Sequence, residues 1–288
     1  MPHGLDHIVH AVRDLDAAAK FYASAGFAVG SRNRHPFGTH NRIVQMTNCY
    51  IEIVEIAEPE KIAPHAARSF SFGAFNCDFL ARHEGFSMVL LNSREASLDA
   101  RAFEAAGIGG FDVFDFAREG KRPDGSTVKL AFSLAYAADP ASPDARFAAC
   151  QHHYPENFWD PAVQVHPNGS RKVIGVTMVA NDPARHQSFL KAFTGISDLR
   201  STALGMTSHT QNGDIEVLQP AVYRDRVGVA ADTTSEGITI KAMRFNVADI
   251  ARAEALLGEN GLASSRRAGR LVIAPEVAHG ATLIFEKV

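Results

Sequence analysis

A unit of one strand, one helix and three further strands repeats along this chain of 288 residues. In its first copy, the apolar strand LDHIVHAV precedes RDLDAAAKFYASAG, which has carboxylates near its start and a glycine at its end, as helices do. The strands FAVGSRNR, NRIVQMT and YIEIVEI complete the unit. Repetition of this kind indicates that the whole fold is built from copies of one structural module.

Three further copies follow, over about residues 85–153, 171–220 and 237–288, and the first spans about 4–57. Any chain of mixed helices and strands offers some such stretches, but here the order of elements recurs together with a glycine after each helix. We therefore predict an α+β fold of four βαβββ modules that form two paired-module domains. The closing glycines are Gly26, Gly107, Gly195 and Gly261.

The chain length and one proline-rich segment predict where the domains divide. At roughly 150 residues per domain, the chain has room for about two. The segment HYPENFWDPAVQVHPNGS contains three prolines and few β-branched residues, which is typical of a connection between folded units. We therefore expect a first domain over residues 1–157, a linker over 158–170 and a second domain over 171–288.

Charge and hydrophobicity argue against several classes of partner. Lys and Arg number 29 against 32 Asp and Glu, so the chain lacks the positive field by which proteins bind nucleic acid. No run approaches the ~18 consecutive apolar residues of a membrane-spanning helix, and the N-terminus lacks the basic and apolar regions of a signal peptide. We therefore expect a cytoplasmic protein with no membrane partner. Its three cysteines are far apart, which favours neither a disulfide framework nor a zinc–thiolate site.

The segments LDHIVHAVRDLDAAAKFY and RHPFGTHNRIVQMTNCYIEIVEI together resemble the opening module of the vicinal oxygen chelate superfamily, in its glyoxalase-like branch. The resemblance to that branch covers residues 1–170, and the rest of the chain matches only the module pattern. It implies that two modules pair into a cupped sheet around a divalent metal, with ligands on the first and fourth strands of each module. The superfamily includes glyoxalase I, extradiol dioxygenases, fosfomycin-resistance proteins and metal-free binding proteins, so fold is implied more firmly than reaction.

The resemblance places two candidate metal ligands in the first module. His7 matches the first-strand ligand, and Glu52 matches the fourth-strand carboxylate. Glu52 lies between Ile51 and Ile53, and a carboxylate buried on such a strand is costly unless it is paired or binds a cation. An ion pair with a nearby arginine would satisfy the same rule.

The second module departs from the expected ligand pattern. Its first strand, FSMVLLNS, has no histidine, whereas its last strand, RFAACQHH, ends in His152 and His153. We take His152 as the third ligand and His153 as the alternative register. Two histidines and a carboxylate suit non-haem iron(II), and such ligands also accept zinc, manganese or nickel. A purely structural hydrogen-bonding role for each histidine is the alternative, and in that case no metal is bound.

The second half of the chain departs further from the ligand pattern. Gly175 stands where His7 stands in the first module, and Glu216 takes the place of Glu52. At the end of the chain, Ile284 falls at the expected carboxylate position, with Glu286 one pleat further along. We therefore expect a structural or substrate-covering role for this half, with Glu216 solvated or ion-paired.

Polar residues around the first hairpin are the candidate substrate-binding groups. Arg34, His35, Asn41 and Arg42 lie within nine positions around a Pro–Gly turn, and arginine can bind a carboxylate through two parallel hydrogen bonds. A solvated hairpin loop is the alternative. Phe158, next to the single tryptophan, either caps a small-molecule pocket or packs between the two domains.

Together these residues favour a metal-dependent lyase or isomerase of the glyoxalase type. It would act on a small oxygenated substrate that chelates the ion, and Glu52 or a neighbour would move the proton. One alternative is a non-enzymatic protein that sequesters a small molecule. Another is an extradiol-type dioxygenase, although that class usually has its glutamate in the last module. Resemblance to the superfamily also makes a homodimer an expectation.

Overall fold

The structure is a computed structural model that describes residues 2–121, 125–231 and 237–287. The strands of the first half are β1 (Leu5–Ala11), β2 (Asn33–Arg34), β3 (Thr39–Gln45), β4 (Tyr50–Ile56), β5 (Gly85–Ser93), β6 (Phe114–Lys121), β7 (Thr127–Ala137) and β8 (Arg146–His152). Its helices are α1 (Leu15–Ser24), α2 (Phe72–Arg82), α3 (Ala96–Ala105) and the short α4 (Pro155–Phe158), with 3-10 turns at Pro59–Lys61 and Pro161–Gln164.

The second half repeats this order of elements. Its strands are β9 (Ser170–Val179), β10 (Arg200–Thr202), β11 (Gly205–Thr210), β12 (Gly213–Leu218), β13 (Thr239–Val247), β14 (Ser265–Arg267), β15 (Arg270–Ile273) and β16 (Thr282–Glu286). Its helices are α5 (Gln187–Thr194), preceded by a 3-10 turn at Pro183–His186, α6 (Pro220–Val227) and α7 (Ile250–Glu259).

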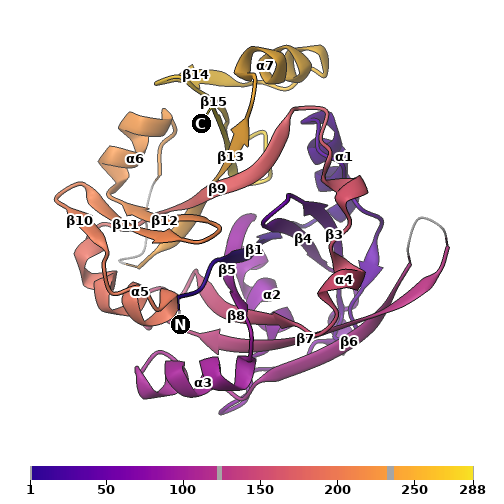
Figure 1. The fold of residues 1–288 in the computed structure, drawn as a ribbon, viewed down its shortest axis with the longest axis vertical. Coiled ribbons are helices and arrows are strands. Elements are labelled where there is room, and N and C mark those ends of the chain that lie inside the picture. The colour runs from indigo at the N-terminus through magenta and orange to yellow at the C-terminus, as the bar shows by residue number, and fades with distance from the viewer. Residues whose placement is uncertain (1, 122–124, 232–236, 288) are drawn as a thin grey trace.

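The two halves form two eight-stranded sheets of identical topology. The strand orders are β2-β3-β4-β1-β5-β8-β7-β6 and β10-β11-β12-β9-β13-β16-β15-β14. In each sheet the first strands of two modules pair antiparallel at the centre, and each of them pairs in parallel with the last strand of its own module. Figure 1 shows the sheets side by side, the first toward the lower right and the second toward the upper left. The predicted α+β fold of four βαβββ modules is confirmed.

Local sequence explains most of these elements. The Asp14 side chain accepts hydrogen bonds from the backbone of Asp16 and Ala17 and so caps α1, as the carboxylates near its start predict. Three helices were not predicted. Of these, α2 and α6 each lie between the two modules of a pair, and the short α4 lies where the proline-rich connection was expected. The edge strands β10 and β14 were also missed, because each has only three residues and all of them are exposed.

A single hydrophobic cluster joins the two halves. It contains α1 and β1 side chains from the first half and β9, β13 and β16 side chains from the second. The ring of Phe27 packs against those of Phe245 and Phe285, with the centroids of Phe27 and Phe245 5.2 Å apart. We call this cluster the shared core. The predicted division at 158–170 stays a prediction, and the outermost residues of the predicted domains, 1 and 288, lie outside the described residues.

The predicted linker packs closely on the first half. The imidazole of His166 accepts a hydrogen bond from the backbone of Ala28 and donates one to the carbonyl of Gln45. The side chain of Gln45 in turn donates to the carbonyl of Phe158 and accepts from the backbone of Asp160. These bonds fix α4 against the first sheet.

The opposite face of the first sheet has its own apolar lining. Val9, Tyr50, Phe132 and Cys150 belong to a second cluster, separate from the shared core, as alternation along strands predicts. Within the described ranges, no helix is long and apolar enough to cross a membrane.

Candidate functional site

A cavity opens on the face of the first sheet that is turned away from the shared core. Together with the open space at its mouth, it measures about 490 Å³. Six phenylalanines line it, from the β2–β3 loop, α2, β6, β7 and α4. The polar groups that reach it are His7, His35, Asn41, Glu52, Arg118 and Cys150.

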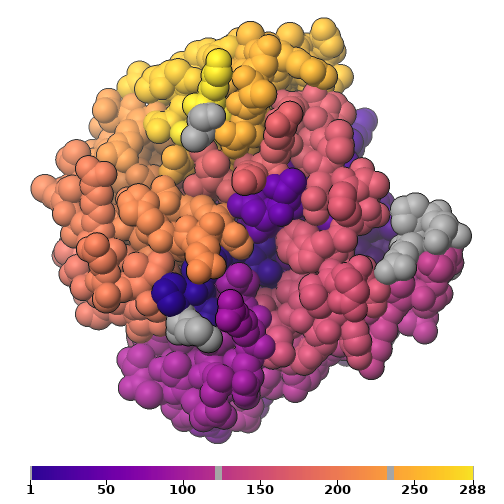
Figure 2. Space-filling model, viewed as in Figure 1, coloured from indigo at the N-terminus to yellow at the C-terminus, as the bar shows by residue number. Residues whose placement is uncertain are grey.

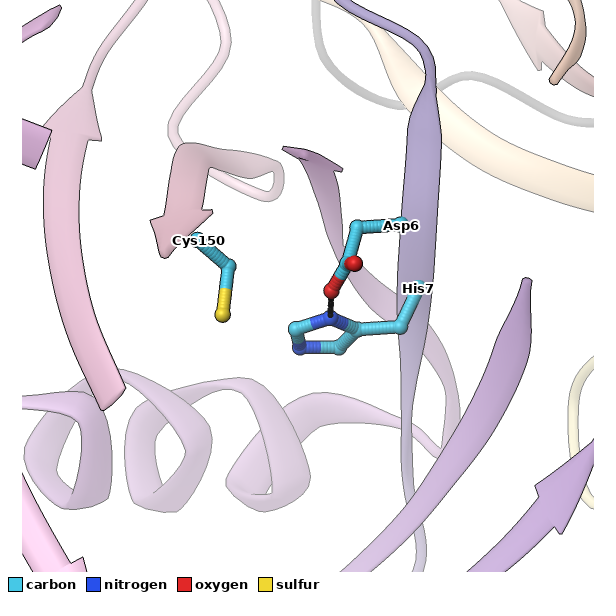
Figure 3. Close-up of side chains that lie close together, drawn as sticks. All are labelled: Asp6, His7 and Cys150. Atoms are coloured by element: carbon cyan, nitrogen blue, oxygen red, sulfur yellow. Dashed lines mark hydrogen bonds and ion pairs between the residues drawn. The ribbon is translucent and has the colours of Figure 1, made fainter. Parts of the chain in front are cut away.

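A β-bulge places two polar side chains of β1 together at one end of this cavity. Leu5 pairs with Leu91 and His7 pairs with Leu90, so Asp6 has no partner on β5. Because the extra residue of a bulge breaks strict alternation, the Asp6 carboxylate lies on the same side as His7. Its Oδ2 is 2.6 Å from Nδ1 of His7 (Figure 3).

The Asp6 carboxylate is held as an anion by two imidazoles. It also accepts a hydrogen bond from Nε2 of His152 at 3.1 Å. Burial alone raises the pKa of Asp6, but the bonds and charges of His152 and His7 outweigh it and lower the pKa well below its usual range. Asp6 accepts a hydrogen bond from Nδ1 of His7, so in the neutral imidazole Nε2 is the atom with the free lone pair.

Glu52 faces that free nitrogen. Its Oε2 is 3.7 Å from Nε2 of His7, which is longer than a hydrogen bond, while its Oε1 accepts a hydrogen bond from Asn41 at 2.6 Å. Glu52 is only 7% exposed. In the described part of the chain no lysine or arginine nitrogen lies within 4.0 Å of its carboxylate, so the ion pair weighed as an alternative is not formed.

His35 and Asn41 form the polar wall beside Glu52. Burial lowers the pKa of His35 to about 4, although the charge of Glu52 raises it, so His35 is neutral at pH 7. The Asn41 amide donates to Nε2 of His35 as well as to Glu52. The hydrogen-bond pattern therefore assigns the His35 proton to Nδ1, which donates to Thr39.

Strand register shows which residue of the second module corresponds to Glu52. In the first module His7 pairs with Tyr50, and Glu52 lies two residues further along β4. On β5 the partner of His7 is Leu90, which pairs with Ala148 on β8. Cys150, two residues beyond Ala148, therefore occupies the position that corresponds to Glu52, and Leu90 the position that corresponds to His7.

Cys150 approaches the cluster on β1. One donor atom each from Asp6, His7 and Cys150 lies within 4.8 Å of the others (Figure 3). Burial, together with the charges of Asp6 and Glu52, raises the pKa of the Cys150 thiol well above its usual value. Without a bound cation the group is therefore a neutral thiol and a poor nucleophile.

The two histidines at the end of the second module lie on opposite faces of the sheet. His152 stacks against Trp159 and contacts Asp6, so it lies behind His7 and outside the cavity. His153 lies on the other face, where Nε2 is 2.7 Å from the hydroxyl of Ser133. Neither histidine points at Glu52.

The structure brings only some of the predicted substrate-binding residues to the cavity. His35, Asn41 and Phe158 line it. Arg42 lies on the opposite face of β3, where it donates to Asp16 and to the carbonyl of Gly30. Arg34 is exposed on β2 and does not line the cavity.

Sequence reasoning assigned no role at this site to four groups, namely Asp6, Tyr50, Arg118 and Cys150, although the thiol of Cys150 was considered as a nucleophile and set aside for lack of an orienting residue. Tyr50 stacks on His7, with ring centroids 4.3 Å apart. Alternation on β6 gave one usable signal, because Phe114, Phe116 and Arg118 share a face in the segment FDFARE. Nothing in the sequence marks the bulge that turns Asp6 inward.

The equivalent place in the second sheet holds ion pairs. Register puts Gly175 at the position of His7, Arg244 at that of Leu90, and Glu216 and Glu286 at those of Glu52 and Cys150. Glu286, and not Ile284, is therefore the last-strand equivalent. The guanidinium of Arg244 donates to Glu286 at 2.7 Å, and its Nη1 is 3.9 Å from Glu216. A Cβ on Gly175 would lie 2.8 Å from the carbonyl oxygen of Asp214 and 3.2 Å from that Nη1, so glycine leaves room for both the neighbouring strand and the guanidinium.

Two surface grooves adjoin the cavity of the first sheet. The larger shares Ile43, Arg118 and Phe158 with the cavity and continues along β7 and the 3-10 turn after α4. The second shares Cys150 and runs past His152 toward Asn212 of the second half. Figure 2 shows the surface hollowed near its centre, where the indigo, magenta, rose and orange parts of the chain meet.

Sequence comparison gives one match. Residues 5–194 match the sequence model of a family described as glyoxalase-like domain. No curated protein matches the chain in sequence.

Several solved structures share the fold. A hypothetical protein from Staphylococcus aureus is similar with a TM-score of 0.66 and 12% identity, over 99% of each chain. A mutant of 4-hydroxymandelate synthase from Streptomyces coelicolor has a TM-score of 0.58 and 11% identity, over 99% of this chain and 92% of that one. A fusion of a xylose isomerase-like TIM barrel and 4-hydroxyphenylpyruvate dioxygenase has a TM-score of 0.52 and 15% identity, over 100% of this chain and 50% of the fusion. At these identities the likeness concerns the fold alone.

Proposed function

The chain belongs to the glyoxalase-like family of the vicinal oxygen chelate superfamily, and on that premise we propose that it is a metal-dependent lyase or isomerase. Its substrate is a small molecule with two oxygens that chelate the ion. The observation that carries the proposal is the pair formed by Nε2 of His7 and Oε2 of Glu52, 3.7 Å apart on adjacent central strands.

The residues present fit a divalent transition metal. Two ligand atoms about 2.0–2.2 Å from one ion lie roughly 3–4 Å apart, which is the separation of His7 and Glu52. The carboxylate–imidazole bond from Asp6 orients His7 in the way that outer-shell carboxylates orient metal ligands. Cys150, at the position that corresponds to Glu52, is the proposed third donor. Its sulfur lies within 4.8 Å of a donor atom of His7, in a group whose third member is Asp6 and not Glu52. In this proposal His152, predicted as a ligand, instead positions Asp6.

The donor set limits which metal suits the site. One imidazole, one carboxylate and one thiol favour zinc, nickel or iron(II), accept manganese less well, and disfavour the hard ions magnesium and calcium. A bound divalent ion would act as a Lewis acid toward a substrate carbonyl.

Glu52 is the candidate general base. Its carboxylate would remove a proton from the carbon next to a substrate carbonyl, with the C–H electron pair passing to the oxygen as an enediolate forms. Returning the proton to the neighbouring carbon completes an isomerisation. Asn41 fixes one oxygen of Glu52, while neutral His35 beside it adds no competing positive charge.

Two alternatives have specific support. Leu90 takes the place of a ligand in the second module, which favours a protein that binds a small molecule without transforming it. Two of the solved structures that share the fold are a 4-hydroxymandelate synthase and a fusion with a 4-hydroxyphenylpyruvate dioxygenase, which favours oxidation of an aromatic substrate. The position of Glu52 in the first module argues for proton transfer.

Metal content tests the proposal. We expect protein purified without chelator to contain about one zinc, nickel or iron per chain by elemental analysis. His7→Ala and Glu52→Gln should lose the metal, because each removes a ligand, and Asp6→Asn should weaken metal affinity by about 10- to 100-fold. His153→Ala is the matched control, because this neighbouring histidine lies on the other face of the sheet.

Two results would contradict the proposal. In the first, wild-type protein is loaded with zinc, nickel, manganese or iron(II) and dialysed, and it retains less than about a tenth of an equivalent of metal per chain. The other is full metal content in both ligand variants. The first result would favour the binding protein.

A further inference from the structure

Arg118 is the only arginine that lines the cavity among the described residues. It lies on β6, on the same face as Phe114 and Phe116, so the strand presents two aromatic rings and one guanidinium to the same space. Neither the proton-transfer proposal nor the predicted ligand set gives this residue a role.

The positive charge of Arg118 lacks a partner of opposite charge. No carboxylate oxygen within the described ranges lies within 4.0 Å of its guanidinium. Its Nη1 donates to the side chain of Asn33 at 3.1 Å and to the carbonyl of Glu119 at 3.3 Å, both neutral acceptors. Its Nε is buried and has no hydrogen-bond partner. Arg42, on β3 and on the other face of the sheet, is by contrast paired with Asp16.

A half-buried guanidinium without a counter-ion carries a cost that an anionic ligand removes. Burial lowers the pKa of Arg118, although the charges of Glu52 and Tyr50 raise it. Taking a cation out of water is unfavourable unless it is paired. Arginine pairs best with a planar carboxylate, which it can bind through two N–H groups.

Arg118 also lies where a ligand would enter. It lines both the cavity and the larger groove that reaches the surface. A molecule that moves from this groove toward Glu52 therefore passes the guanidinium. The walls on the way are aromatic: the rings of Phe116 and Phe132 are 5.1 Å apart, and those of Phe37 and Phe114 are 5.3 Å apart.

We propose that Arg118 binds the carboxylate of a substrate whose aromatic part lies among these phenylalanines. One unpaired cation balances one negative charge, which favours a single carboxylate over a phosphate dianion. The substrate class is thus a small aromatic acid. This inference rests on the proposed function only in taking the cavity as the substrate site, and it does not require a bound metal.

Binding of simple probes tests this assignment. Phenylacetate and phenylacetamide have the same shape and differ in charge. We expect wild-type protein, both as purified and after chelator treatment, to bind phenylacetate at least about tenfold more tightly than phenylacetamide, as is usual for a hydrogen bond to a charged group. Calorimetry and the fluorescence of Trp159, next to Phe158 at the cavity, report the binding.

Variants of Arg118 separate its charge from its geometry. Arg118→Leu should remove the preference for phenylacetate and leave phenylacetamide binding within about twofold. Arg118→Lys should keep part of the preference, because it retains the charge without the planar fork. Arg42→Leu is the matched control and should bind both probes like the wild type.

Four outcomes would overturn the assignment. They are binding of neither probe by the wild type at millimolar concentration, equal binding of both probes, an unchanged preference in Arg118→Leu, and tighter binding of phenyl phosphate than of phenylacetate. Because the measurement includes chelator-treated protein, it stands even if the metal proposal fails. Conversely, a metal-binding protein that shows one of these outcomes would retain the proposed function and lose the substrate class.

Discussion

One unpaired residue in a strand determines the geometry of the candidate site. Asp6 is extra in the pairing of β1 with β5, and that single insertion brings its carboxylate to Nδ1 of His7. The bond fixes the imidazole so that Nε2 faces Glu52. Ile174 occupies the same extra position in the second sheet, where Gly175 has no imidazole to orient. The same backbone irregularity therefore serves a polar site in one sheet only.

We expect the buried imidazole of His10 to make the folded protein less stable in acid. Both ring nitrogens are hydrogen-bonded: Nδ1 accepts from the Tyr22 hydroxyl, and Nε2 donates to the carbonyl of His279. Burial lowers the pKa of His10 from an ordinary 6.5 to about 4. Between these two pH values, His10 takes up a proton in the unfolded chain but not in the folded protein. The stability that neutral His10 contributes above pH 6.5 is therefore lost as the pH falls.

We expect the free energy of unfolding to drop by about 2 kcal/mol more between pH 7 and pH 5 in the wild type than in His10→Gln. Urea denaturation at the two pH values measures this difference. His209→Gln is the control, because that side chain is 60% exposed and should leave the pH dependence unchanged. An equal pH dependence in the wild type and His10→Gln would show that His10 is not the responsible group.

At the scale of elements, the central strands of the two sheets pair in the same register but carry different side chains at the equivalent positions. In the first sheet the four equivalent positions are His7, Glu52, Leu90 and Cys150. In the second they are Gly175, Glu216, Arg244 and Glu286, and the guanidinium lies between the two carboxylates. An internal cation thus stands where the proposed ion would lie in the first sheet.

Arg244→Leu should lower the free energy of unfolding by about 2–3 kcal/mol. Removing one partner of a buried pair usually costs about 3–5 kcal/mol, and here Arg226 and Arg270 remain beside the carboxylates. Chemical denaturation measures the change. Arg266→Leu is the control: its pair with Glu254 is exposed and contributes at most about 1 kcal/mol. Equal losses of unfolding free energy in the two variants would show that the ion pairs of Arg244 stabilise the fold no more than an exposed pair does.

At the scale of the whole molecule, the two sheets share one core. Phe147 and Phe193, from different halves, have ring centroids 5.1 Å apart, and Phe27 packs against two rings of the second half. Neither half can bury this surface alone. We therefore expect the boundary at 158–170 to mark a repeat in the sequence and not two independently stable units.

Calorimetry tests this expectation. The protein should unfold in one transition, with the calorimetric and van't Hoff enthalpies equal. Phe27→Ala should lower that single midpoint by about 10 °C, because such a truncation costs about 3–5 kcal/mol. Two resolved transitions, only one of which moves in the variant, would contradict a shared core. Leu98→Ala, on an exposed face of α3, should leave the midpoint unchanged.

The sequence by itself determined the modules. Period-two strands, capped helices and closing glycines are local signals, and they were enough to predict four βαβββ units. The resemblance to the superfamily, and not these signals, placed His7, Glu52, His35 and Asn41 at one site. Local signals failed for β10 and β14, which are too short to show a period. They also failed for α2 and α6, which lie outside the repeating unit.

Only the tertiary structure decided which side chains meet. Cys150 rather than His152 corresponds to Glu52 because register between distant strands sets that relation, and a shift of one residue would turn every side chain to the other face. The inward turn of Asp6 depends on a bulge, and the isolation of Arg118 depends on where other strands place their carboxylates. Such relations join residues far apart in the chain, so no local pattern contains them.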